Sequence, residues 1–210
     1  LDEINMNNVY VDKMNADSLK IEGILKSGEI GLSNEAEHLF MDLDLTSELS
    51  IIDRGDTSFL NNKPIVLKTK VDFNKQNEFI QLSESAVEIM NSSFNLEGAL
   101  DVKDNFDLDL KIKGQKSDFS LLIALAPDDL IPLLSSFENR GEVFFEAQVK
   151  GAVGNGNFPK ITADFGCENG FFKNNRTDKS IESLQFKGHF ENEQNKGIES
   201  MKFYLSDFQE

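Results

Sequence analysis

The sequence has few of the residues that most often carry out chemistry. Its 210 residues include one cysteine, two histidines and no tryptophan. The single cysteine, Cys167, excludes an intramolecular disulfide, and His38 and His189 lie too far apart for the short spacing of a metal-binding motif. Nothing in the sequence suggests a serine, histidine and acid acting together. We therefore expect a protein that is not an enzyme and that needs no cofactor and no metal.

Long hydrophobic runs and clustered positive charge are also missing. No segment approaches the ~18 apolar residues of a membrane-spanning helix. The chain has 21 basic residues against 37 acidic ones, a formal net charge of −16. Because nucleic-acid phosphates are bound by clustered Lys and Arg, we expect no nucleic-acid partner. The chain begins with Leu1 and has no recognisable leader, so we expect a fragment of a longer protein.

What the sequence does contain is an alternation of period two. Residues 39–45, 65–73 and 94–102 place apolar side chains at every second position, and the pattern returns after residue 141. This alternation is typical of a strand with one apolar and one solvated face. Short polar breaks, such as residues 74–77, separate successive strands. Such short turns favour antiparallel neighbours, so the sequence predicts a meander in which each strand pairs with the next.

One segment, residues 118–138, has a helical pattern instead. Ser117 or Asp118 can cap a first helix that Pro127 would stop, and a second short helix would follow and end near Gly141. We call this segment the helical insertion. Its apolar residues are expected to be Leu121, Leu122, Leu125, Leu130, Leu133 and Leu134.

The fold class that we expect is mainly β. A long, antiparallel, strongly twisted meander sheet would form an open groove or half-barrel in a single domain of residues 1–210, with the helical insertion attached. The sequence leaves open whether residues 1–60 join this sheet, and whether its apolar face is an open groove or a closed core. The side chains expected to line that groove or core are Phe94, Leu96, Leu100, Phe106, Leu108, Leu110 and Ile112.

Two patterns superficially resemble active-site motifs. Asp42 with Asp44, and Asp107 with Asp109, are carboxylate pairs, but their spacing on alternating strands favours a solvated outer face. The glycine-rich residues 151–156 lack the Lys-Ser/Thr of a phosphate-binding loop and precede a strand rather than a helix. We interpret them as a connecting loop.

Five sequence blocks occur in an order that resembles a known family. They are the strand pattern at 106–114, Asp-Phe-Ser-Leu-Leu at 118–122, Ala-Pro at 126–127, Gly-Glu-Val-Phe-Phe at 141–145 and Cys-Glu-Asn-Gly-Phe-Phe-Lys at 167–173. In this order they resemble the C-terminal region of the AsmA-like family of bacterial envelope proteins. The resemblance covers most of residues 65 to 208.

The resemblance implies a groove module similar to bridge-like lipid transfer proteins. Acyl chains would lie in the groove, and the implied function is glycerophospholipid movement between inner and outer membrane, or support of outer-membrane biogenesis. The chain would then be the periplasmic portion of an inner-membrane-anchored protein in a Gram-negative-type envelope. Its partners would be phospholipid or another acyl-chain ligand, with possible envelope proteins. The alternative is a structural or protein-interaction domain with a closed apolar core.

Overall fold

The chain folds into one antiparallel sheet with a small helical insertion. The computed structural model describes residues 2–14, 20–52, 58–103, 106–116, 118–126, 128, 131–153, 157–193 and 200–209. Eleven strands within these residues pair in the order of the sequence, each with the strand before it and the strand after it. The first and last strands lie at the two edges, so the sheet is not a closed barrel.

The elements are named in chain order. The strands are β1 (Asp2–Met14), β2 (Lys20–Glu35), β3 (His38–Ile52), β4 (Ser58–Asn74), β5 (Phe79–Ile89), β6 (Ser92–Asp101), β7 (Asp107–Lys116), β8 (Phe137–Ala152), β9 (Lys160–Asn174), β10 (Lys179–Glu191) and β11 (Lys202–Gln209). The helices α1 (Ser120–Leu125) and α2 (Ile131–Leu134) lie between β7 and β8.

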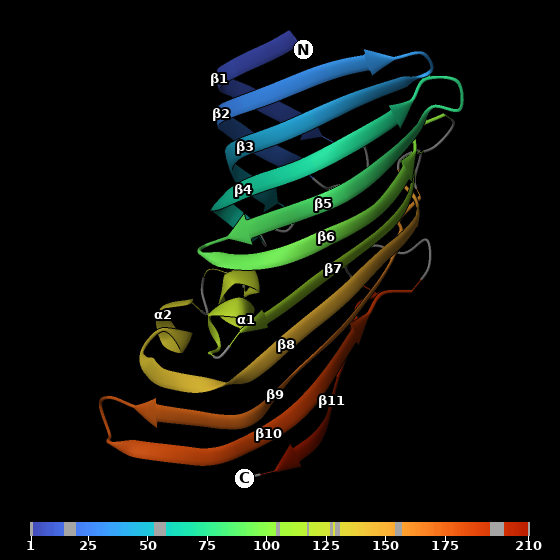
Figure 1. The fold of residues 1–210 in the computed structure, drawn as a ribbon. Coiled ribbons are helices and arrows are strands. Elements are labelled where there is room, and N and C mark those ends of the chain that lie inside the picture. The colour runs from blue at the N-terminus through green and yellow to red at the C-terminus, as the bar shows by residue number, and fades with distance from the viewer. Residues whose placement is uncertain are drawn as a thin grey trace.

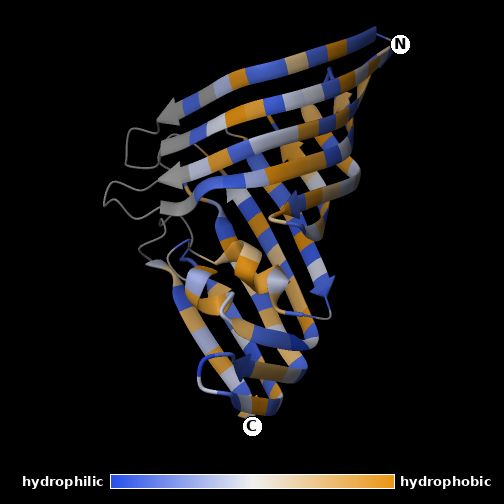
Figure 2. Ribbon diagram, turned by 90° about the vertical axis from the view of Figure 1, so that its left-hand side faces the viewer, coloured by the Kyte–Doolittle hydropathy of each residue, from blue (hydrophilic) through white to orange (hydrophobic). Residues whose placement is uncertain are grey.

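The sheet is strongly curved along its length. Its strands lie side by side from the N-terminal edge to the C-terminal edge, with the two helices beside the lower strands (Figure 1). Neighbouring strands are ~4.8 Å apart, so the sheet spans roughly 48 Å across its strands. The helices lie against its concave side (Figure 2). We call this concave side of the sheet the trough.

Cross-strand register places apolar residues on the trough side of strand after strand. Leu45 lies opposite Leu67, which lies opposite Val87, which in turn lies opposite Phe94. Residues directly opposite in an antiparallel pair have their side chains on the same face. The alternation of apolar and polar residues along each strand is visible in Figure 2. The register therefore turns separate strand patterns into one continuous apolar surface.

The opposite, convex face carries charged pairs in register. Asp44 lies opposite Lys68 with their charged atoms 2.8 Å apart, and Asp109 lies opposite Lys150 at the same distance. Hydrogen bonds from Lys150 and then Gln148 hold the pKa of Asp109 below its ordinary value. The prediction that these aspartates lie on a solvated outer face is thus confirmed for Asp44 and Asp109.

The expected fold class is confirmed, and the strands are longer than their apolar patterns. Residues 65–73 belong to the 17-residue strand β4, and residues 143–149 to the 16-residue β8. The described parts of residues 1–60 join the same sheet as β1, β2 and β3, which answers the question that the sequence left open. Polar residues within these strands obscured their full length.

The helical insertion differs in detail from its prediction. α1 starts at Ser120, whose backbone N–H donates to Asp118 Oδ1 at 2.9 Å. The second helix ends at Leu134, so the prediction that it continues to near Gly141 is wrong. Phe137 begins β8 instead, because it pairs with Asn174 of β9. Ser117 and the predicted helix stop Pro127 lie outside the described residues.

Local irregularities bend the strands. The register shifts by a residue or more at several points, among them Leu82/Ser85 between β5 and β6. Such bulges bend a strand and increase its twist. Gly98, opposite Leu82, has a φ of +141°, and a Cβ added there would meet Asp109 O at 2.0 Å. Only glycine fits this close approach of β6 and β7.

Replacing Gly98 with alanine should therefore destabilise the sheet. We expect Gly98→Ala to lower the free energy of unfolding by about 3 kcal/mol, from overpacking and strain at a positive φ. Urea unfolding followed by circular dichroism measures this loss. Gly23→Ala is the matched control, because its added Cβ would lie 3.2 Å from Glu48 O without a positive φ. Equal losses in the two variants would contradict this account.

Candidate functional site

Most apolar residues of the trough are only partly covered. Leu96 lies opposite Ile112 and Leu100 lies opposite Leu108, so the structure brings these predicted groove residues together on neighbouring strands. All four, and Leu110 beside them, are half-buried. A closed sandwich core would bury such residues almost completely. The trough is therefore an apolar surface that the protein itself leaves partly open.

Two of the predicted groove residues behave differently. Phe94 is 1% exposed and belongs to the core cluster beneath the helical insertion. Phe106 precedes β7, has a φ of +48° and is 55% exposed. It therefore lies outside the continuous strand pattern that the sequence suggested, whereas Phe94 is part of the core.

The helical insertion covers one part of the trough. Leu121 of α1 is fully buried and packs with Phe94, Val143 and Leu184, which come from three different strands. Gly114 of β7 makes room for it, because a Cβ there would lie 2.5 Å from Leu121 Cδ1. The core of the protein is thus formed by the sheet and α1 together.

The other predicted insertion residues lie at its surface or over a cavity. Leu122 and Leu125 are half-buried on α1, and Leu134 is half-buried on α2. Leu133 is 58% exposed. Leu130 lies outside the described residues. The insertion therefore has a buried side on the sheet and a second apolar side that the sheet does not cover.

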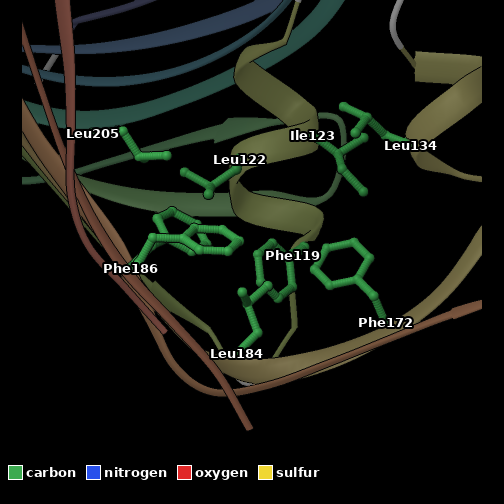
Figure 3. A pocket seen from close by; sticks show the side chains of 9 residues that line it. Phe119, Leu122, Ile123, Leu134, Phe172, Leu184, Phe186 and Leu205 are labelled. Atoms are coloured by element: carbon green, nitrogen blue, oxygen red, sulfur yellow. The ribbon is translucent and has the colours of Figure 1, made fainter. Parts of the chain in front are cut away.

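A cavity of about 290 Å³ lies beside α1, toward the C-terminal edge of the sheet. Its side chains converge from both helices and from the last strands (Figure 3). Phe119, which precedes α1, packs edge-on against Phe172 of β9 with ring centroids 4.3 Å apart. The residues that line this cavity, which we call the apolar pocket, are Phe119, Leu122, Ile123, Leu134, Phe172, Leu184, Phe186, Leu205 and Phe208.

A buried lysine holds the other end of α1. Lys63 of β4 is 2% exposed, and its Nζ lies 3.0 Å from Asp128 Oδ1. The same ammonium donates to the carbonyl oxygen of Ala126 at 3.0 Å. Cations near the C-terminal end of a helix are favourable because they bind its unpaired carbonyl groups. Lys63 thus links the helical insertion to β4, which lies two strands away from β6 in the sheet.

The sequence predicts the helix α1, but it does not predict the apolar pocket or Lys63 as the anchor of α1. Phe172 lies on β9, and Leu184 and Phe186 alternate on β10, so the local pattern indicates strands and not a pocket. The sequence gives no indication that Lys63 is buried, because a lysine beside a strand pattern is usually exposed to solvent. The sequence places these side chains on strands, but it does not indicate that they come together around one pocket.

Within the described residues, the site contains no cluster of side chains that could hold a metal ion. No three His, Cys, Asp or Glu side chains gather there, and every buried side-chain nitrogen or oxygen in that part has a partner. His38 and His189 each face an aspartate across a strand pair, Asp72 at 2.6 Å and Asp164 at 2.8 Å. What the trough offers a ligand is apolar surface.

Comparisons with known proteins identify no relative. No family model matches the chain, and neither a curated protein nor a solved structure matches it. Within the described residues, no helix is long and apolar enough to cross a membrane.

The Lys63–Asp128 pair should contribute to stability more than surface pairs do. Asp128→Asn leaves a buried ammonium without its counter-charge, and we expect the free energy of unfolding to fall by about 2 kcal/mol. Thermal or urea unfolding measures the change. Asp44→Asn, the same substitution in the exposed pair with Lys68, should leave the midpoint nearly unchanged. If the two variants behave alike, Lys63 does not anchor the insertion.

Cys167 should make stability depend on alkaline pH. Burial, followed by the charges of Glu168 and Glu142, raises the pKa of its thiol from 9.0 to about 11. The unfolded chain ionises first as pH rises, so the thiol's contribution to stability is complete below pH 9 and lost on the way to pH 11. The difference in unfolding free energy between wild type and Cys167→Ala should fall across this interval. A constant difference would contradict the raised pKa.

Proposed function

We propose that this protein is a non-catalytic module whose trough binds, and allows movement of, acyl chains of lipids. One observation carries the proposal: apolar residues continue in register across the sheet and remain only half-buried through most of it. A monomeric soluble protein rarely exposes an apolar surface that extends so far.

The physics of such a surface suits hydrocarbon. Each methylene moved from water to an apolar environment contributes ~0.8 kcal/mol, so a long chain binds without any specific polar contact. Charged pairs such as Asp44–Lys68 lie on the convex face instead. A lipid in the trough would keep its head group toward water at the open side. Selectivity would come from chain shape rather than head-group recognition.

The cellular setting is part of the proposal and rests on the AsmA-like resemblance. On that resemblance the lipid is a phospholipid, and it moves between inner and outer membrane. The chain would be the periplasmic portion of an inner-membrane-anchored protein that serves outer-membrane biogenesis. The geometry supports only the acyl-chain part of this proposal.

Tryptophan reporters test whether acyl chains enter the trough. The natural sequence has no tryptophan, so Leu43→Trp places a single reporter on the trough side of β3. We expect a fatty acid brominated in mid-chain to quench this tryptophan strongly and saturably, because bromine and indole come into contact. Steady-state fluorescence titration measures the effect.

Asp44→Trp is the matched control, since the next residue along β3 lies on the convex face. It should be quenched no more than free tryptophan in the same solution. Equal quenching at both positions, or none at position 43, would refute acyl-chain binding in the trough.

The alternative function is protein interaction, and the edge strand β11 favours it. Phe203 and Tyr204 of β11 are both at least half exposed, and among the strands that the structure describes β11 pairs only with β10. An unpaired strand edge can accept a strand from another protein. Such a partner would protect the backbone amides of β11 from hydrogen exchange and would leave the reporter at position 43 unquenched.

A further inference from the structure

The apolar pocket differs from the rest of the trough in having walls on several sides. α1 and the residue before it supply Phe119, Leu122 and Ile123, and α2 supplies Leu134. Strands β9 to β11 supply the remaining side chains. Among the described residues, four phenylalanines, four leucines and one isoleucine line the pocket, and no polar side chain does.

We propose that the apolar pocket holds the methyl end of a single acyl chain whose polar head stays outside. This inference rests on the proposed function and goes beyond it, because it assigns one end-site, walled on several sides and open on another, to a surface that is otherwise an open trough. The chain's orientation then follows: hydrocarbon end beside α1, head group toward solvent.

The lining chemistry favours a hydrocarbon chain over a peptide backbone or a charged molecule. A peptide segment would bring backbone N–H and C=O groups into a pocket without hydrogen-bonding side chains, and each unpaired group would cost free energy. A head group or a charged metabolite meets the same penalty. A hydrocarbon chain has no group to satisfy, so it matches the walls that Leu122, Phe186 and Leu205 provide.

The volume limits the occupant to one chain. About 290 Å³ is slightly below the usual range of ligand pockets, ~300–1,000 Å³. The pocket is thus too small for two chains of a phospholipid side by side or for a helix about 10 Å across. It accommodates the last part of one chain, and the rest must lie outside it.

The wall formed by α1 is held in place from both ends. At its start, Asn139 Oδ1 accepts the backbone N–H of Phe119 at 3.0 Å, and Leu121 is buried against the sheet. At its end, Lys63 binds Ala126 and Asp128. These contacts keep the pocket formed without a ligand, so binding does not require α1 to reorganise.

Two fatty acids of equal length test the assignment. Palmitic acid has one methyl end and one carboxylate, whereas hexadecanedioic acid carries a carboxylate at each end. If one end of the chain must enter the apolar pocket, the diacid has to bury a carboxyl group without a hydrogen-bonding partner. Hexadecanedioic acid should therefore bind at least about thirtyfold more weakly than palmitic acid. Isothermal titration calorimetry of the whole chain gives both dissociation constants.

Pocket-filling variants locate the effect. Leu205→Trp enlarges a half-exposed wall residue of β11 and should weaken palmitic acid about tenfold by displacing a few methylenes. Leu134→Trp fills the pocket from α2 and provides a second, independent variant. Tyr204→Trp is the control, next to Leu205 on β11 but on the opposite, convex face and outside the pocket lining. It should bind palmitic acid as the wild type does.

The outcomes separate the two proposals. Weaker binding of the diacid, with weaker palmitic acid binding in Leu205→Trp or Leu134→Trp but not in Tyr204→Trp, supports the end-site. Equal binding of the two acids, unaffected by the pocket variants, overturns the end-site and leaves acyl-chain binding in the open trough intact. Absence of binding by either acid overturns both.

Discussion

An antiparallel sheet with one apolar face has to cover that face with something, and the rest of this structure follows from how incompletely it does so. A second sheet packed against this face would bury it, and closure of the sheet into a barrel would turn it toward the interior. Here the order of strands leaves both edges unpaired, and the only described elements on the trough are two short helices. A ligand can bind to the uncovered part of this face.

The helical insertion gives the protein its core as well as its pocket. One side of α1 buries Leu121 against Phe94 and Val143, and the other side faces the apolar pocket. Its hydrogen-bonding ends are bound by Asn139 and Lys63, so a six-residue helix, too short to be stable alone, is fixed by tertiary contacts. A helix fixed beside an open sheet produces a partly walled pocket within a long apolar surface.

The elements and their pairing were largely readable from the sequence, whereas their ends and the site were not. The period-two pattern predicted the meander, and six of the seven residues expected to line a groove or core lie on β6 and β7, whereas Phe106 precedes β7. The helix predicted to run to Gly141 ends at Leu134, because pairing of Phe137 with Asn174 across the sheet outweighs local helical preference. β1 and β2 were not predicted, since their polar residues hide the alternation.

By itself the sequence determined that the chain forms strands with one apolar and one charged face, joined by short turns and with one helical interruption. These properties follow from local chemistry: side-chain alternation, turn residues and composition. Only the tertiary structure decided that the apolar face stays partly open, that Lys63 is buried, and that α1 and β9 to β11 enclose a pocket. Those features depend on curvature and on contacts between residues about 60 or more positions apart, such as Lys63 with Ala126, which no local pattern encodes.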